Sequence, residues 1–301
     1  MKRSLRWTRS RLNRMPHFRI QHQIEYRYDA PVELQPHWIR LQPRGNHFQQ
    51  LRSFQLQIHP QPNRLFEVQE LDGNLCQRAW FDRPSDHFKL QAIAEVVTCL
   101  DNPFEFLLEP WAIRLPLRSE AQSQHDRLAP YRCSLLPGGF DPACVRLAQQ
   151  LLEQAKNDTL SFLLLLNQYL YERIRYVQRP FGDPRWPGQT LALGQGSCRD
   201  TTVLFLEVCR VVGLAGRFVS GYHWGGPEAE TFDLHAWAEV YLPGAGWRGF
   251  DPTIGLATAE AHIAIASAPL PSQAAPTEGS YYGPGISATL SYQVVLVRLS
   301  D

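Results

Sequence analysis

The spacing of apolar residues indicates strands in the first third of the chain. Apolar and polar residues alternate there, as they do in a β-strand that buries one face. Residues 66–71 and 75–81 flank the turn Asp72-Gly73-Asn74 and are typical of a β-hairpin. The other alternating stretches are residues 20–28, 54–58 and 92–98. This pattern predicts an antiparallel β-sandwich-like domain.

After residue 140 the apolar residues recur at the spacing of an α-helix instead of alternating. Asp141 followed by Pro142 is typical of a helix start, because the first side chain can cap the helix and the second tolerates its first turn. Thr159 is predicted to cap a second helix that runs to Ile174, and a third helix is predicted to begin at Cys198 and to end at Gly213. Strands are predicted after them over residues 217–222, 234–242, 247–250 and 289–299. The order predicts helices packed on an antiparallel sheet, an α+β arrangement.

The chain is long enough for two hydrophobic cores. It has 301 residues, of which 44% are hydrophobic and 20% charged, and this composition is typical of a soluble globular protein. We expect a basic, disordered tail, the β domain, a polar connector and the α+β domain. These four segments are residues 1–16, 17–117, 118–140 and 141–301.

The charge of the chain is unevenly spread. Six basic residues and no acidic one precede His17, and without them the formal net charge of +1 becomes −5. The negative net charge of the residues after this basic segment argues against nucleic-acid binding. No apolar run reaches the roughly 20 residues of a membrane span, and the N-terminus lacks the apolar region of a secretory signal. We therefore expect a cytoplasmic protein that does not bind a membrane.

The cysteines point to neither disulfides nor a metal. The six are spread along the chain without a C-x-x-C pair, unlike a disulfide framework or a zinc ribbon. We expect most of them to be reduced and structural, and we expect no metal and no cofactor.

Cys198 is the residue best suited to chemistry. Gly194 and Gly196 interrupt the structure before it, so the predicted helix begins at the cysteine itself. The unpaired N–H groups and the positive end of the dipole at a helix start favour the thiolate, which is the nucleophilic form. Cysteines are more often simply buried, so a catalytic interpretation depends on partners.

His235 and Asp251 are the predicted partners. Asp251 ends the strand that follows the strand of His235, and antiparallel pairing across a short turn can bring the two side chains together. His235 would take the thiol proton and hold the thiolate as an ion pair, while Asp251 would orient the imidazole. Asp233 is an alternative orienting residue and is less favoured, because Asp251 fits the strand geometry.

These residues lie in motifs that resemble the bacterial transglutaminase-like superfamily. The motifs are Gly196-Ser197-Cys198-Arg199-Asp200, Arg217-Phe218-Val219-Ser220-Gly221-Tyr222, His235-Ala236-Trp237 and Gly246-Trp247-Arg248-Gly249-Phe250-Asp251-Pro252-Thr253. In the first domain, Tyr26-Arg27-Tyr28-Asp29-Ala30-Pro31-Val32 and Leu41-Gln42-Pro43-Arg44 resemble the N-terminal domain of bacterial members. The resemblance covers residues 17–266.

The resemblance implies a papain-like core in which Cys198, His235 and Asp251 form the catalytic triad. Bacterial relatives are often regarded as cysteine peptidases or amide hydrolases. The chain departs from many relatives at Ala266-Ser267-Ala268-Pro269, where they carry Gly-Arg-Asp-Tyr. It also lacks an acidic cluster of the kind that binds calcium in animal transglutaminases.

Residues around the triad have expected roles of their own. Trp186 and Gln195 lie in the loop before Cys198, and we expect them to bind substrate together with Trp237. Trp237 would shield the Cys–His pair from water, or else only fill the core. We expect Arg199 and Asp200 to form a charge pair that stabilises the helix start.

Three functions fit these residues. The one we predict is a thiol-dependent hydrolase of amide or peptide bonds, which acts through an acyl-enzyme thioester on a protein or peptide substrate. The second is transglutamination, in which an amine instead of water resolves the thioester. The third is a catalytically silent peptide-binding module, against which the intact triad argues.

Overall fold

The computed structural model describes residues 15–117, 126–226 and 233–299, so residues 1–14 of the predicted basic tail lie outside the described part. The first strands are β1 (His17–Leu34), β2 (His37–Ile39), β3 (Gln49–His59), β4 (Arg64–Gln69), β5 (Leu75–Trp80) and β6 (Ser85–Thr98). The next elements are η1 (Pro110–Ala112), η2 (Ala129–Tyr131), α3 (Pro142–Gln154), α4 (Thr159–Arg173), β7 (Arg175–Tyr176), α5 (Pro187–Leu193), β8 (Gln195–Gly196) and α6 (Cys198–Val211). The last are β9 (Gly216–His223), β10 (His235–Leu242), β11 (Gly246–Asp251), β12 (Leu256–Ala257), β13 (His262–Ala268), η3 (Pro271–Ala274), β14 (Thr277–Glu278), β15 (Tyr281–Tyr282) and β16 (Ala288–Leu299).

Two antiparallel sheets form the first domain, as the alternating pattern predicted. In the larger sheet β1 lies between β6 and β16, and β3 lies beyond β6. The smaller sheet has the order β14-β2-β5-β4 and includes the predicted hairpin. His37 of the smaller sheet and Phe88 of the larger one are buried with ring centroids 4.5 Å apart. Apolar side chains therefore fill the space between two sheets, which confirms the sandwich-like class.

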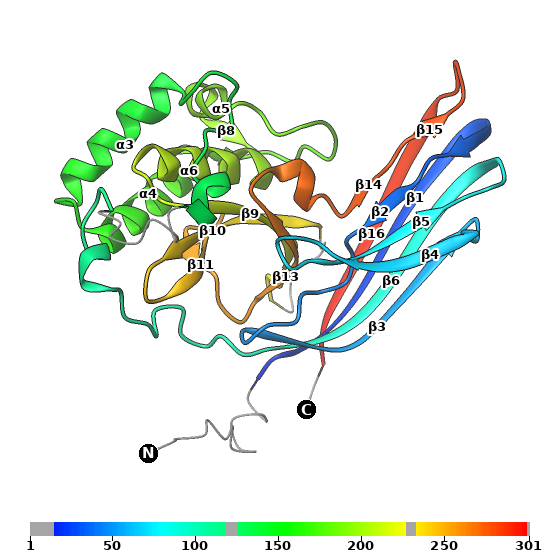
Figure 1. Cartoon of the computed structure of the whole chain (residues 1–301), viewed down its shortest axis with the longest axis horizontal. Coiled ribbons are helices and arrows are strands. Elements are labelled where there is room, and N and C mark those ends of the chain that lie inside the picture. The colour runs from blue at the N-terminus through cyan, green and yellow to red at the C-terminus, as the bar shows by residue number, and fades with distance from the viewer. Residues whose placement is uncertain (1–14, 118–125, 227–232, 300–301) are drawn as a thin grey trace.

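The final strand belongs to the first domain, which corrects the predicted extent of the second domain, residues 141–301. β16 was predicted as a strand, but it pairs with β1 from His17 opposite Leu299 to Tyr28 opposite Ala288. The red end of the chain accordingly runs beside the blue beginning in Figure 1. The physical reason is that β1 is bonded to β6 on one side only, and β16 covers the free edge.

The second domain places helices on one side of an antiparallel sheet with the order β12-β11-β10-β9-β13. Figure 1 shows α3, α4, α5 and α6 gathered beside this sheet. Every residue of α6 except Arg199 and Val211 is buried, so this helix is the centre of the domain and not a surface element. This arrangement confirms the predicted α+β class. No helix in the described ranges is both long and apolar enough to cross a bilayer.

The predicted helices exist, with small differences at their starts. The side chain of Asp141 caps α3 by accepting from the N–H of Ala143. Thr159 was predicted to cap α4, but it is the first helical residue, and the capping side chain is that of Asp158, one position earlier. The loop before Cys198 also contains a short helix, α5, which begins at Pro187 where the missing N–H costs nothing.

The two domains meet at the edge strand β13. The side-chain amide of Gln49 bonds both the N–H and the C=O of Ala264, each at 2.8 Å. Asn74, in the turn of the β4–β5 hairpin, bonds both the N–H and the C=O of Ser267, each at 2.9 Å. Two side-chain amides thus replace a neighbouring strand and cover an edge that would otherwise expose unpaired backbone groups.

Asn74→Ala should loosen this contact. It leaves the buried N–H and C=O of Ser267 without these partners, at about 1–3 kcal/mol for each group, so we expect the free energy of unfolding to fall by about 2–4 kcal/mol. Urea unfolding followed by tryptophan fluorescence measures the change. The control Gln69→Ala removes an exposed amide from the same hairpin and should change stability by less than about 0.5 kcal/mol. Equal stability of the two variants would contradict the edge-covering role.

Candidate active site

Cys198 is the first residue of α6, as the sequence predicted, and its side chain is largely buried. A capping box fixes the helix start. The hydroxyl of Ser197 accepts from the N–H of Asp200 at 3.5 Å, and the carboxylate of Asp200 accepts from the N–H of Ser197 at 2.8 Å. These reciprocal bonds hold the residues on both sides of the cysteine.

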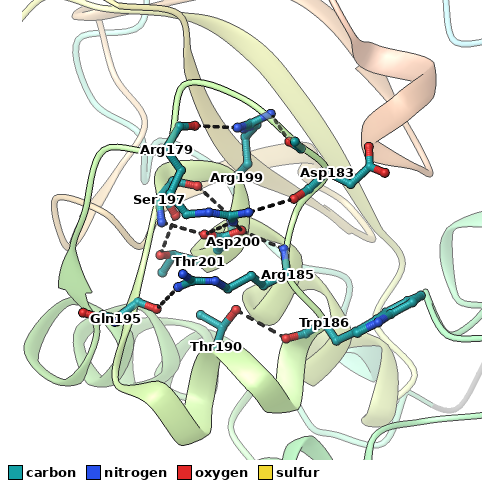
Figure 2. Close-up of polar contacts among 11 residues, drawn as sticks. Arg179, Asp183, Arg185, Trp186, Thr190, Gln195, Ser197, Arg199, Asp200 and Thr201 are labelled. Carbon is teal, nitrogen blue, oxygen red and sulfur yellow. Dashed lines mark hydrogen bonds and ion pairs between the residues drawn. The ribbon is translucent and has the colours of Figure 1, made fainter.

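The carboxylate of Asp200 also anchors the loop that precedes α5 (Figure 2). Its two oxygens accept from Nη1 of Arg179 at 2.5 and 2.7 Å, and one accepts from the N–H of Arg185 at 2.7 Å. Burial alone would raise the pKa of Asp200, but the hydrogen bonds from Arg179, Arg185 and Ser197 outweigh it and lower the pKa. The carboxylate therefore stays charged and holds loop and helix together.

Arg199 does not pair with Asp200, so that prediction was wrong. Its guanidinium instead donates to the carbonyls of Arg179 at 2.6 Å and Gly182 at 2.8 Å. Consecutive residues on a helix point in different directions, so neighbours in sequence are poor partners. Both Arg199 and Asp200 nevertheless hold the same loop against the start of α6.

His235 and Asp251 meet as the strand geometry predicted. His235 begins β10, Asp251 ends β11, and the two strands pair in antiparallel fashion. Nε2 of His235 lies 2.6 Å from Oδ2 of Asp251, and the side chain of Asp251 is fully buried. The N–H of Thr253 donates to Oδ1 of Asp251 at 2.9 Å, which fixes the other oxygen of the carboxylate.

His262, a residue that sequence reasoning missed, is the second imidazole on this carboxylate. Its Nε2 lies 3.2 Å from Oδ2 of Asp251, and its Nδ1 accepts from the N–H of Ala259 at 3.4 Å. Because Nδ1 accepts, the neutral ring carries its proton on Nε2 and donates to Asp251. Burial lowers the pKa of His262 despite its bonds to Asp251, which favours this neutral form.

The thiol of Cys198 lies beside the His235 imidazole, and both line the same cavity. Since Nε2 is engaged by Asp251, Nδ1 is the ring nitrogen left to face the sulfur. Burial lowers the pKa of His235, but the charge of Asp251, the hydrogen bond to Asp251 and the neighbouring Cys198 outweigh it and raise the pKa to about 10. Burial likewise raises the pKa of Asp251, while the charge of His235 and the bonds from both imidazoles hold it well below its usual range. At neutral pH the pair is an imidazolium beside a carboxylate.

Cys198 and His235 open onto a cavity of about 280 Å³. Part of its wall comes from the loop that Asp200 anchors, through Pro180 and Pro184. Another part comes from β1 and β16 of the first domain. The cavity lies between the two domains, and a buried thiol with a neighbouring imidazole lines it. This arrangement is suitable for attack on a bound carbonyl group.

Two regions of the chain match known families. Residues 18–97 match the bacterial transglutaminase-like N-terminal region, and residues 145–252 match the transglutaminase-like superfamily. The chain belongs to the transglutaminase-like superfamily. Membership supports an enzyme that works through a cysteine. Cys198, His235 and Asp251 all lie within the region that matches the transglutaminase-like superfamily.

Relatives of this transglutaminase-like chain come from several bacteria. It is 26% identical over 290 residues to an uncharacterized protein of Mycobacterium leprae, and the matched region covers 94% of this chain and 99% of that protein. It is 27% identical over 145 residues to the protein-glutamine gamma-glutamyltransferase of Pseudomonas aeruginosa, covering 45% of this chain and 22% of that protein. The fold is similar to the solved structure of a candidate cysteine protease from Cytophaga hutchinsonii, with a TM-score of 0.70, 19% identity and coverage of 95% and 92% of the two chains.

The other residues predicted for the site of the transglutaminase-like core lie apart from the cavity. Trp186 is 56% exposed just before α5, and Gln195 in β8 accepts from Arg175 at 2.6 Å; neither lines the cavity. Their roles in substrate binding stay predictions that their positions do not support. Trp237 is buried with its ring 6.3 Å from that of His235, in place to exclude water.

Asp233, the alternative orienting residue, is bound to a different side chain. It lines the cavity, but its carboxylate accepts from Gln178 at 3.0 Å, whereas the imidazole of His235 bonds Asp251. The side chain that would orient the imidazole in this transglutaminase-like core is therefore that of Asp251.

The lowered pKa of Asp251 predicts a distinct loss of stability in acid. The unfolded carboxylate binds a proton near pH 4 while the folded one does not, so the stability due to its charge is present above about pH 4 and lost below it. The double variant Asp251→Asn, His235→Gln removes this proton together with the imidazole, which without the carboxylate would be buried neutral and would add an acid-linked loss of its own. Between pH 4 and pH 3, the free energy of unfolding of the wild type should fall more steeply than that of the variant, by up to about 1.4 kcal/mol per pH unit. Urea titrations at each pH measure this, and parallel slopes would contradict the pKa shift.

Proposed function

We propose that this protein is a thiol-dependent hydrolase of amide or peptide bonds that acts on protein or peptide substrates. The observation that carries the proposal is the imidazole of His235, which bonds Asp251 through Nε2 at 2.6 Å and lies beside the thiol of Cys198 on the wall of one cavity. The buried carboxylate stabilises the imidazolium, and an imidazolium beside the sulfur stabilises the thiolate. These roles make Cys198 the nucleophile, His235 the acid and base, and Asp251 the orienting residue.

The chemistry proceeds in two halves. The thiolate attacks the amide carbon, a C–S bond forms, and the carbonyl oxygen becomes an oxyanion. The C–N bond then breaks as His235 gives its proton to the departing amine, which leaves a thioester on Cys198. Water attacks the thioester while His235 takes one of its protons, the C–S bond breaks, and the carboxylic acid leaves with the thiolate restored.

The start of α6 offers a place for the oxyanion. The backbone N–H of Cys198 is in the first turn, where an α-helix provides no intrahelical acceptor, and the helix dipole there favours negative charge. The N–H of Ser197 is already bound by Asp200, so that donor is not free for the oxyanion. One backbone donor of this kind typically lowers the barrier by about 2.7–4 kcal/mol.

Transglutamination is the second candidate, and the relative from Pseudomonas aeruginosa favours it. That protein is a protein-glutamine gamma-glutamyltransferase, although this chain spans only 22% of its length. Both reactions share every step up to the thioester and differ in whether water or an amine resolves it.

Alkylation by isotope-labelled iodoacetamide at pH 7 tests the nucleophile. We expect Cys198 to react faster in the native protein than after denaturation, and His235→Ala to slow this reaction about 100-fold, because the base that holds the thiolate is gone. Peptide mapping separates Cys198 from Cys133, which is exposed. His223→Ala is the matched control, since it removes a neighbouring imidazole 5.8 Å from that of His235 and should leave the rate within about twofold. Equal rates in wild type and His235→Ala would argue for a silent binding module.

A competition experiment separates hydrolysis from transfer. Wild type and Cys198→Ala are incubated with a library of glutamine-containing peptides and a fluorescent primary amine, and the products are identified by mass spectrometry. Cleaved or deamidated peptides that depend on Cys198 support the hydrolase. Incorporation of the amine without hydrolysis would replace it with the transferase.

A further inference from the structure

We propose that the first domain selects the substrate: β1 and β16 form a wall that receives an uncharged apolar or aromatic side chain on the acyl group bound to Cys198. This inference rests on the proposed function, because it concerns the group that becomes attached to the sulfur. The acyl group remains bonded to Sγ in the thioester, whereas the amine departs. The cavity into which Cys198 opens must therefore hold the acyl group.

The wall follows from the register between the two strands. Ile24 pairs with Tyr292, and Tyr26 pairs with Leu290, so these four side chains lie on one face of the sheet. All four line the cavity. Their neighbours on β16, Ser291 and Gln293, are exposed and point to the opposite face. A strand that alternates in this way presents a single apolar and aromatic surface to the site.

A buried contact fixes this wall against the second domain. Nδ1 of His22, two residues before Ile24 on β1, lies 2.9 Å from the hydroxyl of Tyr222 on β9. Both side chains are buried, and burial lowers the pKa of His22 to about 4, so the ring is neutral at physiological pH. The sheet is thereby held at a defined position beside Cys198.

The charges of the cavity argue for an uncharged guest at this wall. Among the residues that the structure describes, the charged groups that line the cavity come from the second domain: Arg179, Asp183, Arg199, Asp233 and His235. Arg179 is paired with Asp200, and Arg199 is bound to two backbone carbonyls. The wall itself offers aliphatic groups and phenols, so a charged side chain placed against it would lose water without gaining an ion pair.

The size of the cavity is consistent with one such side chain. A volume of about 280 Å³ lies just below the roughly 300–1,000 Å³ found for small-molecule sites, so the guest at the wall is a small group. In a hydrophobic pocket a single methylene changes selectivity by about 10–200-fold, so the residues of the wall are expected to determine specificity.

Three electrophiles that alkylate Cys198 test the wall. Iodoacetamide is small and reports on the thiolate alone, while the chloromethyl ketones of N-acetyl-phenylalanine and N-acetyl-glutamate carry an aromatic and an anionic side chain. We expect the wild type to react at least about tenfold faster with the phenylalanyl than with the glutamyl probe. Tyr292→Ala should lower the ratio of the phenylalanyl rate to the iodoacetamide rate by about tenfold. Leu290→Lys should turn the preference towards the glutamyl probe.

Gln293→Ala is the matched control, since it changes an exposed residue on the other face of β16 and should keep the wild-type ratios. Leu290 and Tyr292 are both partly exposed, and thermal unfolding of each variant verifies that it is folded. Rapid alkylation by iodoacetamide with rate ratios that neither variant changes would overturn the wall and leave the proposed function standing. If Cys198 reacts with iodoacetamide no faster than in the denatured protein, both proposals fail.

Discussion

The carboxylate of Asp200 is the interaction on which the site depends. It is buried at the start of α6 and binds the Arg179 side chain, the N–H of Arg185 and the N–H of Ser197. Removing one partner of a buried ion pair typically costs about 3–5 kcal/mol, because the other charge is left without compensation. The same helix carries two more buried charges. Glu207 accepts from Ser134 and Leu135 of the connector and from the N–H of Asp141. Arg210 donates to the carbonyls of Cys133, Gly216 and Pro269. The buried helix thus draws the surrounding segments onto itself and gives Cys198 a fixed position.

Asp251 is a second buried carboxylate with a lowered pKa, but its surroundings give it a different role. Asp200 is bound by a guanidinium and backbone N–H groups, none of which changes charge near neutral pH, so it acts as a permanent anchor. Asp251 is bound by two imidazoles, and the one of His235 lies beside the sulfur. His262 donates as a neutral ring, so it supports the carboxylate without competing for the positive charge. The positive charge therefore lies on the imidazole beside Cys198, where a thiolate needs it.

The fold brings the first and last strands together at this site. β1 and β16 run side by side in the first domain (Figure 1). Residues of both strands line the cavity onto which Cys198 opens. Gln49 and Asn74 attach the same domain to the edge strand β13 by replacing a neighbouring strand. Substrate recognition and covalent chemistry are thus assigned to different domains, and the chain must return to its first sheet before the cavity is complete.

The sequence by itself determined the local elements and the chemical types at the site. The start of α6 at Cys198, the strand of His235 and the end of the next strand at Asp251 all follow from hydrophobic period and turn residues, which act over a few neighbouring positions. The tertiary structure alone decided the pairing of β16 with β1, the pairing of Asp200 with Arg179, and the contact of His262 with Asp251. It also placed Trp186 outside the cavity and Tyr292 inside it. Such contacts join residues far apart in the chain, and their formation depends on which buried groups need partners once the domains have packed, which no local pattern records.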